Sequence, residues 1–139
     1  MKFTLSILVM AFMFTSMPAR AQEADKVAKA ETAALAWLAL ADAGDYARSW
    51  DHAASIFQAS ITQQHWMDAL TRVRGPLGSL VSRKIMSAQY ATSLPGAPDG
   101  EYVVIRYETE FTNTKEAIET VTPCLEKDGP WKVSGYYIK

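Results

Sequence analysis

The chain has 139 residues, of which 14 are Lys or Arg, 15 are Asp or Glu and one is Cys. The near-neutral balance of charge gives no electrostatic reason to expect nucleic acid as a partner, and a single cysteine excludes an internal disulfide. The length suits one domain with one hydrophobic core.

The N-terminus is typical of a secretory signal peptide. A positive charge precedes an almost wholly apolar stretch, residues 3–14, and small residues then occupy the positions that a signal peptidase reads. We expect cleavage after Ala21, so that residues 1–21 are the signal peptide and residues 22–139 form a single α+β domain. The alternative, a membrane anchor, is less favoured because crossing a bilayer takes roughly 20 apolar residues. Without the signal peptide, 12 basic and 15 acidic residues leave a net charge of −3.

A tight joint between two amphipathic helices organises the first half of the chain. Residues 25–41 are rich in the helix formers Ala, Leu, Lys and Glu, with apolar residues at spacings of three and four. Gly44 can end this helix in the left-handed conformation at little cost, and the carboxylate of Asp45 can cap the next one. The second helix is expected to continue to about Ala59, so the two helices must fold against each other.

A third helix and four strands are predicted for the rest of the chain. The helix runs from a cap at Thr62 to Arg74, because proline in the following Gly75-Pro76 pair cannot continue it. The strands are expected at residues 80–92, 102–112, 116–126 and 131–138. Asp128-Gly129 predicts a tight turn between the last two strands.

The second strand shows the clearest alternation of apolar and polar residues. Its apolar face is expected to carry Val103, Ile105, Tyr107, Thr109 and Phe111, whereas its other face is mostly polar and includes Glu108 and Glu110. A sheet covered on one side favours antiparallel pairing. Three helices followed by a meander of four strands therefore predict an α+β domain, in which the helices pack on a curved four-stranded antiparallel sheet that forms an open cone.

This order of elements resembles the NTF2-like, or cystatin-like, α+β superfold, a likeness of architecture that implies no function by itself. A more specific pattern resembles a family of short exported bacterial proteins known as domain of unknown function 4019. The matching residues are Trp37-Leu38, Asp42-Ala43-Gly44-Asp45-Tyr46, Ser49-Trp50, Trp66, Arg74 with Pro76-Leu77-Gly78, Ser82-Arg83, Pro95-Gly96, Gly100-Glu101-Tyr102, Glu119-Thr120-Val121 and Trp131 with Ser134-Gly135-Tyr136-Tyr137. The resemblance runs from about Ala34 to the C-terminus and implies no enzymatic activity. The chain departs from the pattern at Gly75, which is compatible with a longer turn.

Seven residues are candidates for ligand contact. They are Tyr46, Trp50, Trp66, Arg74, Arg83, Tyr107 and Tyr137. The tyrosines are candidates for lining a cavity inside the cone. The tryptophans, with Trp37 and Trp131, could form an aromatic pocket, although such side chains more often fill the core.

The two arginines of that set have two readings. A partly buried Arg74 or Arg83 could receive a carboxylate or phosphate in a fork geometry. The favoured alternative is an arginine that pairs with Asp42, with Asp45 or with a helix C-terminus and so stabilises the helix-to-sheet corner.

No catalytic, metal or cofactor motif stands out. His52 and His65 lack the spacing of metal ligands. The sequence contains no Gly-rich phosphate loop and no Gly-x-Ser-x-Gly nucleophile motif. Cys124 falls in a predicted strand and is expected to be a buried, inert thiol.

We therefore expect a periplasmic domain, most simply non-catalytic, that binds a small ligand or a protein partner through the mouth of the cone or the outer sheet face. It is expected to need no cofactor and to have no stable membrane insertion once the signal is cleaved. The alternative is an enzyme that acts on a small apolar substrate by proton transfer, which requires a buried Asp, Glu or His facing a cavity. A homodimer formed through the sheet is a further alternative.

Overall fold

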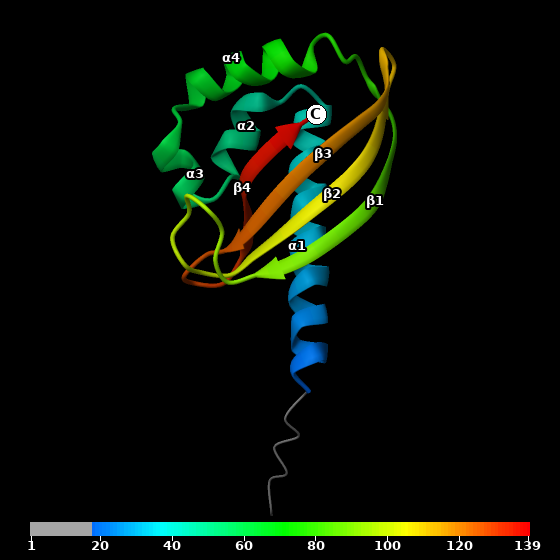
Figure 1. Cartoon of the computed structure of the whole chain (residues 1–139). Helices are drawn as coiled ribbons and strands as arrows, with labels where there is room; N and C mark the ends of the chain where they lie inside the picture. Colours follow the sequence, from blue (N-terminus) through cyan, green and yellow to red (C-terminus); the bar gives the residue numbers. More distant parts are fainter. Residues whose placement is uncertain (1–17) are drawn as a thin grey trace, which may run out of the picture.

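The computed structural model describes residues 18–139, so the apolar part of the predicted signal peptide lies outside the described residues. Helices come first and strands follow, as predicted (Figure 1). The helices of this part are α1 (Ala19–Asp42), α2 (Tyr46–Asp51), α3 (Ser55–Ser60) and α4 (Gln63–Arg74). The strands are β1 (Leu80–Ala91), β2 (Tyr102–Phe111), β3 (Thr114–Leu125) and β4 (Trp131–Ile138). Within residues 18–139, no helix combines the length and apolarity needed to cross a membrane.

The strands form one antiparallel sheet in the order β1-β2-β3-β4, so each strand pairs with its neighbour in sequence. Figure 1 shows the sheet curving across α1, whose first turns project beyond the strands, while α2, α3 and α4 lie toward the β4 side. The sheet does not close into a barrel, since β1 and β4 remain its edges. The predicted α+β meander is confirmed.

The core lies between α1 and the inner face of the sheet. The five residues predicted for the apolar face of β2 are each at most 2% exposed, which confirms the predicted alternation. Ala30, Ala34 and Leu38 of α1 are fully buried in the same core. Burying one large apolar side chain stabilises a fold by about 1.5–3 kcal/mol, so this face supplies much of the driving force.

The joint between the first two helices has the predicted geometry. Gly44 adopts a φ of 76°, and Asp45 accepts a hydrogen bond from the backbone N–H of Arg48 at 3.3 Å. Thr62 caps α4 in the same way by accepting from the backbone N–H of His65 at 3.2 Å. Local capping chemistry is therefore sufficient to place the starts of α2 and α4.

Two predicted helix boundaries are wrong. The first helix begins at Ala19 rather than near residue 25. The predicted second helix is divided into α2 and α3, because the backbone N–H of Ala54 donates to the carbonyl of Val133 on β4 at 2.8 Å. Ala53 and Ala54 are both buried at this break. A contact between residues nearly 80 positions apart in sequence thus overrides the helical periodicity.

The two edges of the sheet differ. Both edge strands have one sheet neighbour, but part of the β4 edge is covered where Ala54 bonds to it, whereas among residues 18–139 no backbone bond from a helix or loop reaches β1. The register between β1 and β2 shifts twice, at Val81 and at Met86, and each of these residues lacks a partner on β2. Such bulges bend and twist the strand that carries them.

Candidate functional site

The two candidate arginines meet a pair of carboxylates at the corner between α1, α4 and the sheet. Arg74, the last residue of α4, donates from Nη2 to Asp42 at 2.7 Å. Arg83 on β1 donates from Nη1 and Nη2 to both oxygens of Asp42, at 2.8 and 2.9 Å. Its Nε donates to Glu119 on β3 at 2.7 Å. We call Asp42, Arg74, Arg83 and Glu119 the corner cluster; its formal charges sum to zero.

Hydroxyl groups complete the coordination of Glu119, which is fully buried. Thr109 donates to its Oε1 at 2.6 Å, and the hydroxyl of Tyr136 donates to its Oε2. Nη1 of Arg74 donates to the Tyr136 oxygen at 3.1 Å and lies 3.7 Å from Oε2 of Glu119. Both carboxylate oxygens are therefore occupied by protein donors.

The electrostatics of the corner cluster favour its charged form. Burial alone would raise the pKa of Asp42, but hydrogen bonds from Arg83 and Arg74 outweigh burial and hold that pKa below its usual range. Burial works against the charge of Arg83, yet hydrogen bonds to Asp42 and Glu119 raise its pKa further. Burial and the charge of Glu119 also raise the pKa of Tyr136. Asp42, Arg83 and Tyr136 thus keep their ordinary protonation states at neutral pH.

Tyr107 is a core residue with an unusual hydroxyl. Its side chain is buried on β2. Among the buried side-chain polar atoms of residues 18–139, the Tyr107 hydroxyl oxygen is the one without a hydrogen-bond partner. Burial raises the pKa of this phenol to about 12, so it stays protonated at neutral pH. The predicted role for Tyr107 in lining a cavity has no counterpart in the hollows described below.

The candidate tryptophans are held by hydrogen bonds to the backbone and to Ser49. Trp66 donates from its indole to Oγ of Ser49 at 2.9 Å, and Trp37 donates to the carbonyl of the same serine at 2.7 Å. Trp50 is half-buried and donates to the carbonyl of Ile61 at 2.9 Å. Buried indoles usually find such partners, and here the bonds join α1, α2 and α4.

The structure brings only part of the candidate set together. Arg74 and Arg83 share Asp42, whereas Tyr46 is half-buried beside the joint and Tyr137 is 60% exposed. None of the seven candidates lines either of the two hollows that follow.

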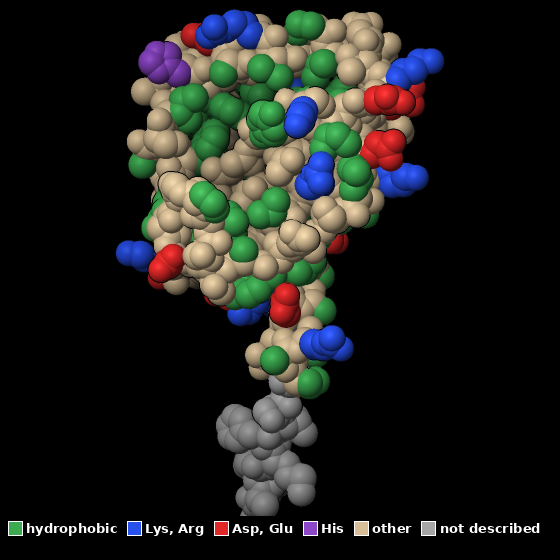
Figure 2. All heavy atoms as spheres, viewed as in Figure 1, with side chains coloured by type: hydrophobic (Ala, Val, Ile, Leu, Met, Phe, Trp, Pro, Cys, Tyr) green, Lys and Arg blue, Asp and Glu red, His purple; other side chains and the backbone are tan. Residues whose placement is uncertain are grey.

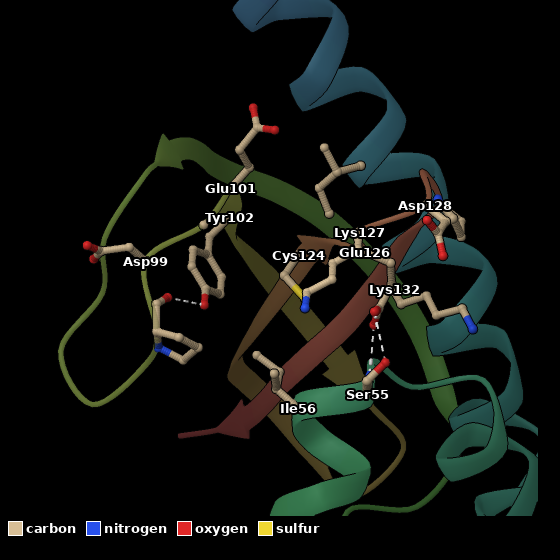
Figure 3. A pocket seen from close by; sticks show the side chains of 14 residues that line it. Ser55, Ile56, Asp99, Glu101, Tyr102, Cys124, Glu126, Lys127, Asp128 and Lys132 are labelled. Carbon is tan, nitrogen blue, oxygen red and sulfur yellow. Dashed lines mark hydrogen bonds between the residues drawn. The ribbon is translucent and has the colours of Figure 1, made fainter.

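The larger hollow, of about 650 Å³, lies between α3, the loop before β2 and the turn after β3 (Figure 3). Tyr102, Cys124 and Ile56 point toward it, and Tyr102 donates to the carbonyl of Pro98 at 2.5 Å. Cys124 is buried and free, as predicted, and burial raises the pKa of its thiol. We call this the α3 hollow.

The smaller hollow, of about 340 Å³, lies between α1, α2 and β4. Trp37 and Trp131 contribute to its lining, together with three residues that carry basic side chains. They are Arg48, His52 and Lys132. We call this the α1–β4 groove.

Sequence reasoning missed Glu119 as a buried charge. Ala117, Glu119 and Val121 alternate along β3 and are all buried, so they face the core together. Apolar residues two positions before and after Glu119, Ala117 and Val121, were the signal that could have identified it as facing the core.

The histidines show no sign of a metal site. Within residues 18–139, no group of three or more His, Cys, Asp or Glu residues is placed to hold a metal ion. Figure 2 shows basic and acidic side chains of both signs scattered on the face in view, with no large patch of one sign.

A family model described as a protein of unknown function, DUF4019, matches residues 33–136. No curated protein and no solved structure matches the chain. The match covers most of the chain, including α2, α3, α4 and nearly all of the sheet. The chain therefore belongs to the DUF4019 family, proteins of unknown function.

Proposed function

We propose that this protein is an exported, periplasmic, non-catalytic domain that binds a small ligand or a segment of a partner protein at the α3 hollow. The observation that carries the proposal is the saturation of the corner cluster. The carboxylate oxygens of Asp42 and Glu119 accept hydrogen bonds from Arg74, Arg83 and hydroxyl groups. Neither carboxylate is therefore placed to exchange a proton with a substrate.

The shape of the α3 hollow supports a binding role. Its volume of about 650 Å³ falls within the range of about 300–1,000 Å³ that is usual for ligand sites. Its apolar lining includes Ile56, Tyr102 and Cys124, and its charged lining residues include Asp99 and Lys127. An apolar floor below charges of both signs suits a ligand with an apolar body and polar ends, such as a short peptide segment.

A thermal-shift screen of the purified protein against peptides, sugars, sterols and lipids tests the binding role. If a compound of the panel raises the melting temperature of the protein, Ile56→Trp should fill the hollow and abolish that shift. Ala59→Trp, an exposed position on the same helix that does not line the hollow, is the matched control. No response to any panel member, together with no partner recovered in a pull-down, would count against the proposal.

Export is tested separately. N-terminal sequencing of protein from a periplasmic fraction should begin at Gln22, because the small residues before it fit signal peptidase. Recovery of the uncleaved chain in the membrane fraction would favour the anchor reading.

The enzyme alternative receives less support. Glu119 is the buried carboxylate that such chemistry would use, but it lines neither hollow. Turnover of a small apolar substrate that disappears in Glu119→Gln while the variant stays folded would restore this alternative. Light scattering of the purified protein decides whether the chain forms a dimer.

A further inference from the structure

The α1–β4 groove is a second site, separate from the α3 hollow. The two adjoin and share Pro130 and Lys132, but the groove lies over α1 and α2 rather than beside α3. Its floor is apolar and includes the rings of Trp37 and Trp131 and the side chain of Val133.

The groove is built into the packing of the domain. Ala33 and Ala36 contribute two small side chains of α1 to the lining of the groove, which also includes Trp37 and Trp131. The bond from the backbone N–H of Ala54, three residues after α2 ends, to Val133 attaches the segment between α2 and α3 to β4. This attachment limits the movement of one wall of the groove relative to β4, and a pre-organised wall lowers the entropic cost of binding.

The charges along the groove are of one sign. Arg48, His52 and Lys132 line it, and no carboxylate does. Among residues 18–139, the structure gives the side chains of His52 and Lys132 no hydrogen bond or ion pair. Arg48 is paired only with Asp45, at 3.7 Å and largely in solvent. An anion in the groove would thus meet basic side chains that protein carboxylates leave largely unneutralised.

We propose that the α1–β4 groove binds an apolar carboxylate, that is, a molecule with a hydrocarbon body and one terminal carboxylate, such as a medium-chain fatty acid. The body lies against the more accessible apolar lining residues of α1, Ala33, Ala36 and Leu40, beside the largely buried rings of Trp37 and Trp131, and burial of this apolar surface supplies the affinity. The carboxylate lies near Arg48 and Lys132, since a guanidinium fork matches two carboxylate oxygens. This inference does not depend on the function proposed for the α3 hollow.

Titration of the purified protein with decanoate, below its micelle-forming concentration, tests the proposal. Tryptophan fluorescence reports occupancy because two indoles line the groove, and calorimetry gives the stoichiometry. We expect one decanoate per chain, bound roughly tenfold more tightly than 1-decanol, because two partly exposed ion pairs supply about that factor. Decyltrimethylammonium, with the same chain and the opposite charge, should bind more weakly than either.

Two pairs of variants locate the site. Ala36→Phe should fill the groove and weaken all decyl probes at least tenfold, whereas Ala39→Phe, an exposed α1 position outside the groove, should not. The double variant Arg48→Gln with Lys132→Gln should remove the preference for decanoate over decanol and leave decanol binding unchanged. Arg72→Gln with Lys127→Gln makes the same change of charge away from the groove and should keep that preference.

Three results would overturn the inference. Decanoate could bind no more tightly than decanol, Ala36→Phe could behave like Ala39→Phe, or the control double variant could lose the preference as well. Ile56→Trp separates the two sites: it blocks the α3 hollow and should leave decanoate binding intact. Loss of decanoate binding in that variant would place the ligand in the α3 hollow and refute the assignment to the groove.

Discussion

The corner cluster and the α1–β4 groove both contain basic side chains, but these side chains are paired with carboxylates in the cluster and largely unpaired in the groove. Arg83 in the cluster is enclosed and bonds to two carboxylates, whereas Lys132 in the groove has no carboxylate partner in the described structure. The difference shows that residue type alone does not indicate a binding site. A buried and satisfied arginine stabilises the fold, and a cation left without a partner is available to a ligand.

The comparison also has an energetic side. Removing one member of a buried, balanced set of charges leaves an uncompensated charge in the interior, which costs several kcal/mol. Removing a solvent-exposed charge with no partner changes stability by less than about 0.5 kcal/mol. Substitutions in the corner cluster should therefore lower the free energy of unfolding by much more than substitutions of the charged residues in the groove.

The largest effect is expected for Glu119→Ala. The substitution leaves two arginines with one carboxylate in the interior, and we expect the free energy of unfolding to fall by about 3–5 kcal/mol. The melting temperature should fall on the order of 10–20 °C in calorimetry. Glu116→Ala, an exposed position on the same strand, is the control. A loss below about 1 kcal/mol for Glu119→Ala would mean that the cluster contributes little to the fold.

A pH titration of stability tests the role of Asp42. Its pKa in the folded state is lowered by hydrogen bonds from Arg83 and Arg74 that outweigh the effect of burial. Its contribution to stability is therefore fully present above the unfolded-state pKa of about 3.9 and is lost as the pH falls through the lower folded-state value.

Asp42→Asn should accordingly lower stability at pH 7 by about 2 kcal/mol and flatten the acid limb of a urea-unfolding series between about pH 5 and pH 2. Asp128→Asn, in an exposed turn, should leave that limb unchanged. An acid limb in Asp42→Asn that is as steep as in the unaltered protein would show that other carboxylates govern acid unfolding.

A smaller effect is expected for Tyr136→Phe. It removes the hydroxyl that donates to Oε2 of Glu119 and accepts from Arg74, so we expect a loss of about 1–3 kcal/mol in chemical denaturation. Tyr137→Phe is a matched control one residue away, because Tyr137 is largely exposed. Equal losses in the two variants would indicate that the hydroxyl of Tyr136 is not part of a stabilising network.

The smallest effect is expected for Lys132→Gln in the groove. Since no side chain or backbone group of residues 18–139 pairs with this ammonium group, the free energy of unfolding should change by less than about 0.5 kcal/mol in the same assay. A loss above about 1 kcal/mol would reveal a structural role and weaken the contrast between the groove and the cluster.

Local patterns were enough to predict much of this fold. Gly44 and Asp45 define the joint through conformational freedom and capping, which depend on adjacent residues alone. The alternation along β2 identified its buried face because a strand covered on one side has a strict period of two. Features of this kind need no knowledge of distant residues.

Features created by distant contacts were not predictable in the same way. The break before α3 depends on a carbonyl of β4, and nothing near Ala54 in the sequence signals that bond. From the sequence, an arginine at this corner was expected to pair with Asp42, with Asp45 or with a helix C-terminus. Both Arg74 and Arg83 reach Asp42, and Glu119 joins them only because the sheet brings β1 and β3 to the same corner. The groove was not predicted because its lining comes from three elements, α1, α2 and β4, and none of their sequences taken singly indicates a binding site.

The two bulges of β1 limit how this strand can recruit others. Between Val81 and Met86 the strand keeps regular register for only four residues, residues 82–85. An incoming extended segment would lose its ladder of main-chain bonds at each bulge, so β1 is a poor template for edge-to-edge pairing with another chain. An exposed lysine in the same interval, Lys84, adds charge repulsion between like copies. The irregular backbone and this lysine both oppose pairing of β1 with the same strand of another copy, which offsets the exposed apolar side chains of Val81, Ile85 and Met86 on this edge.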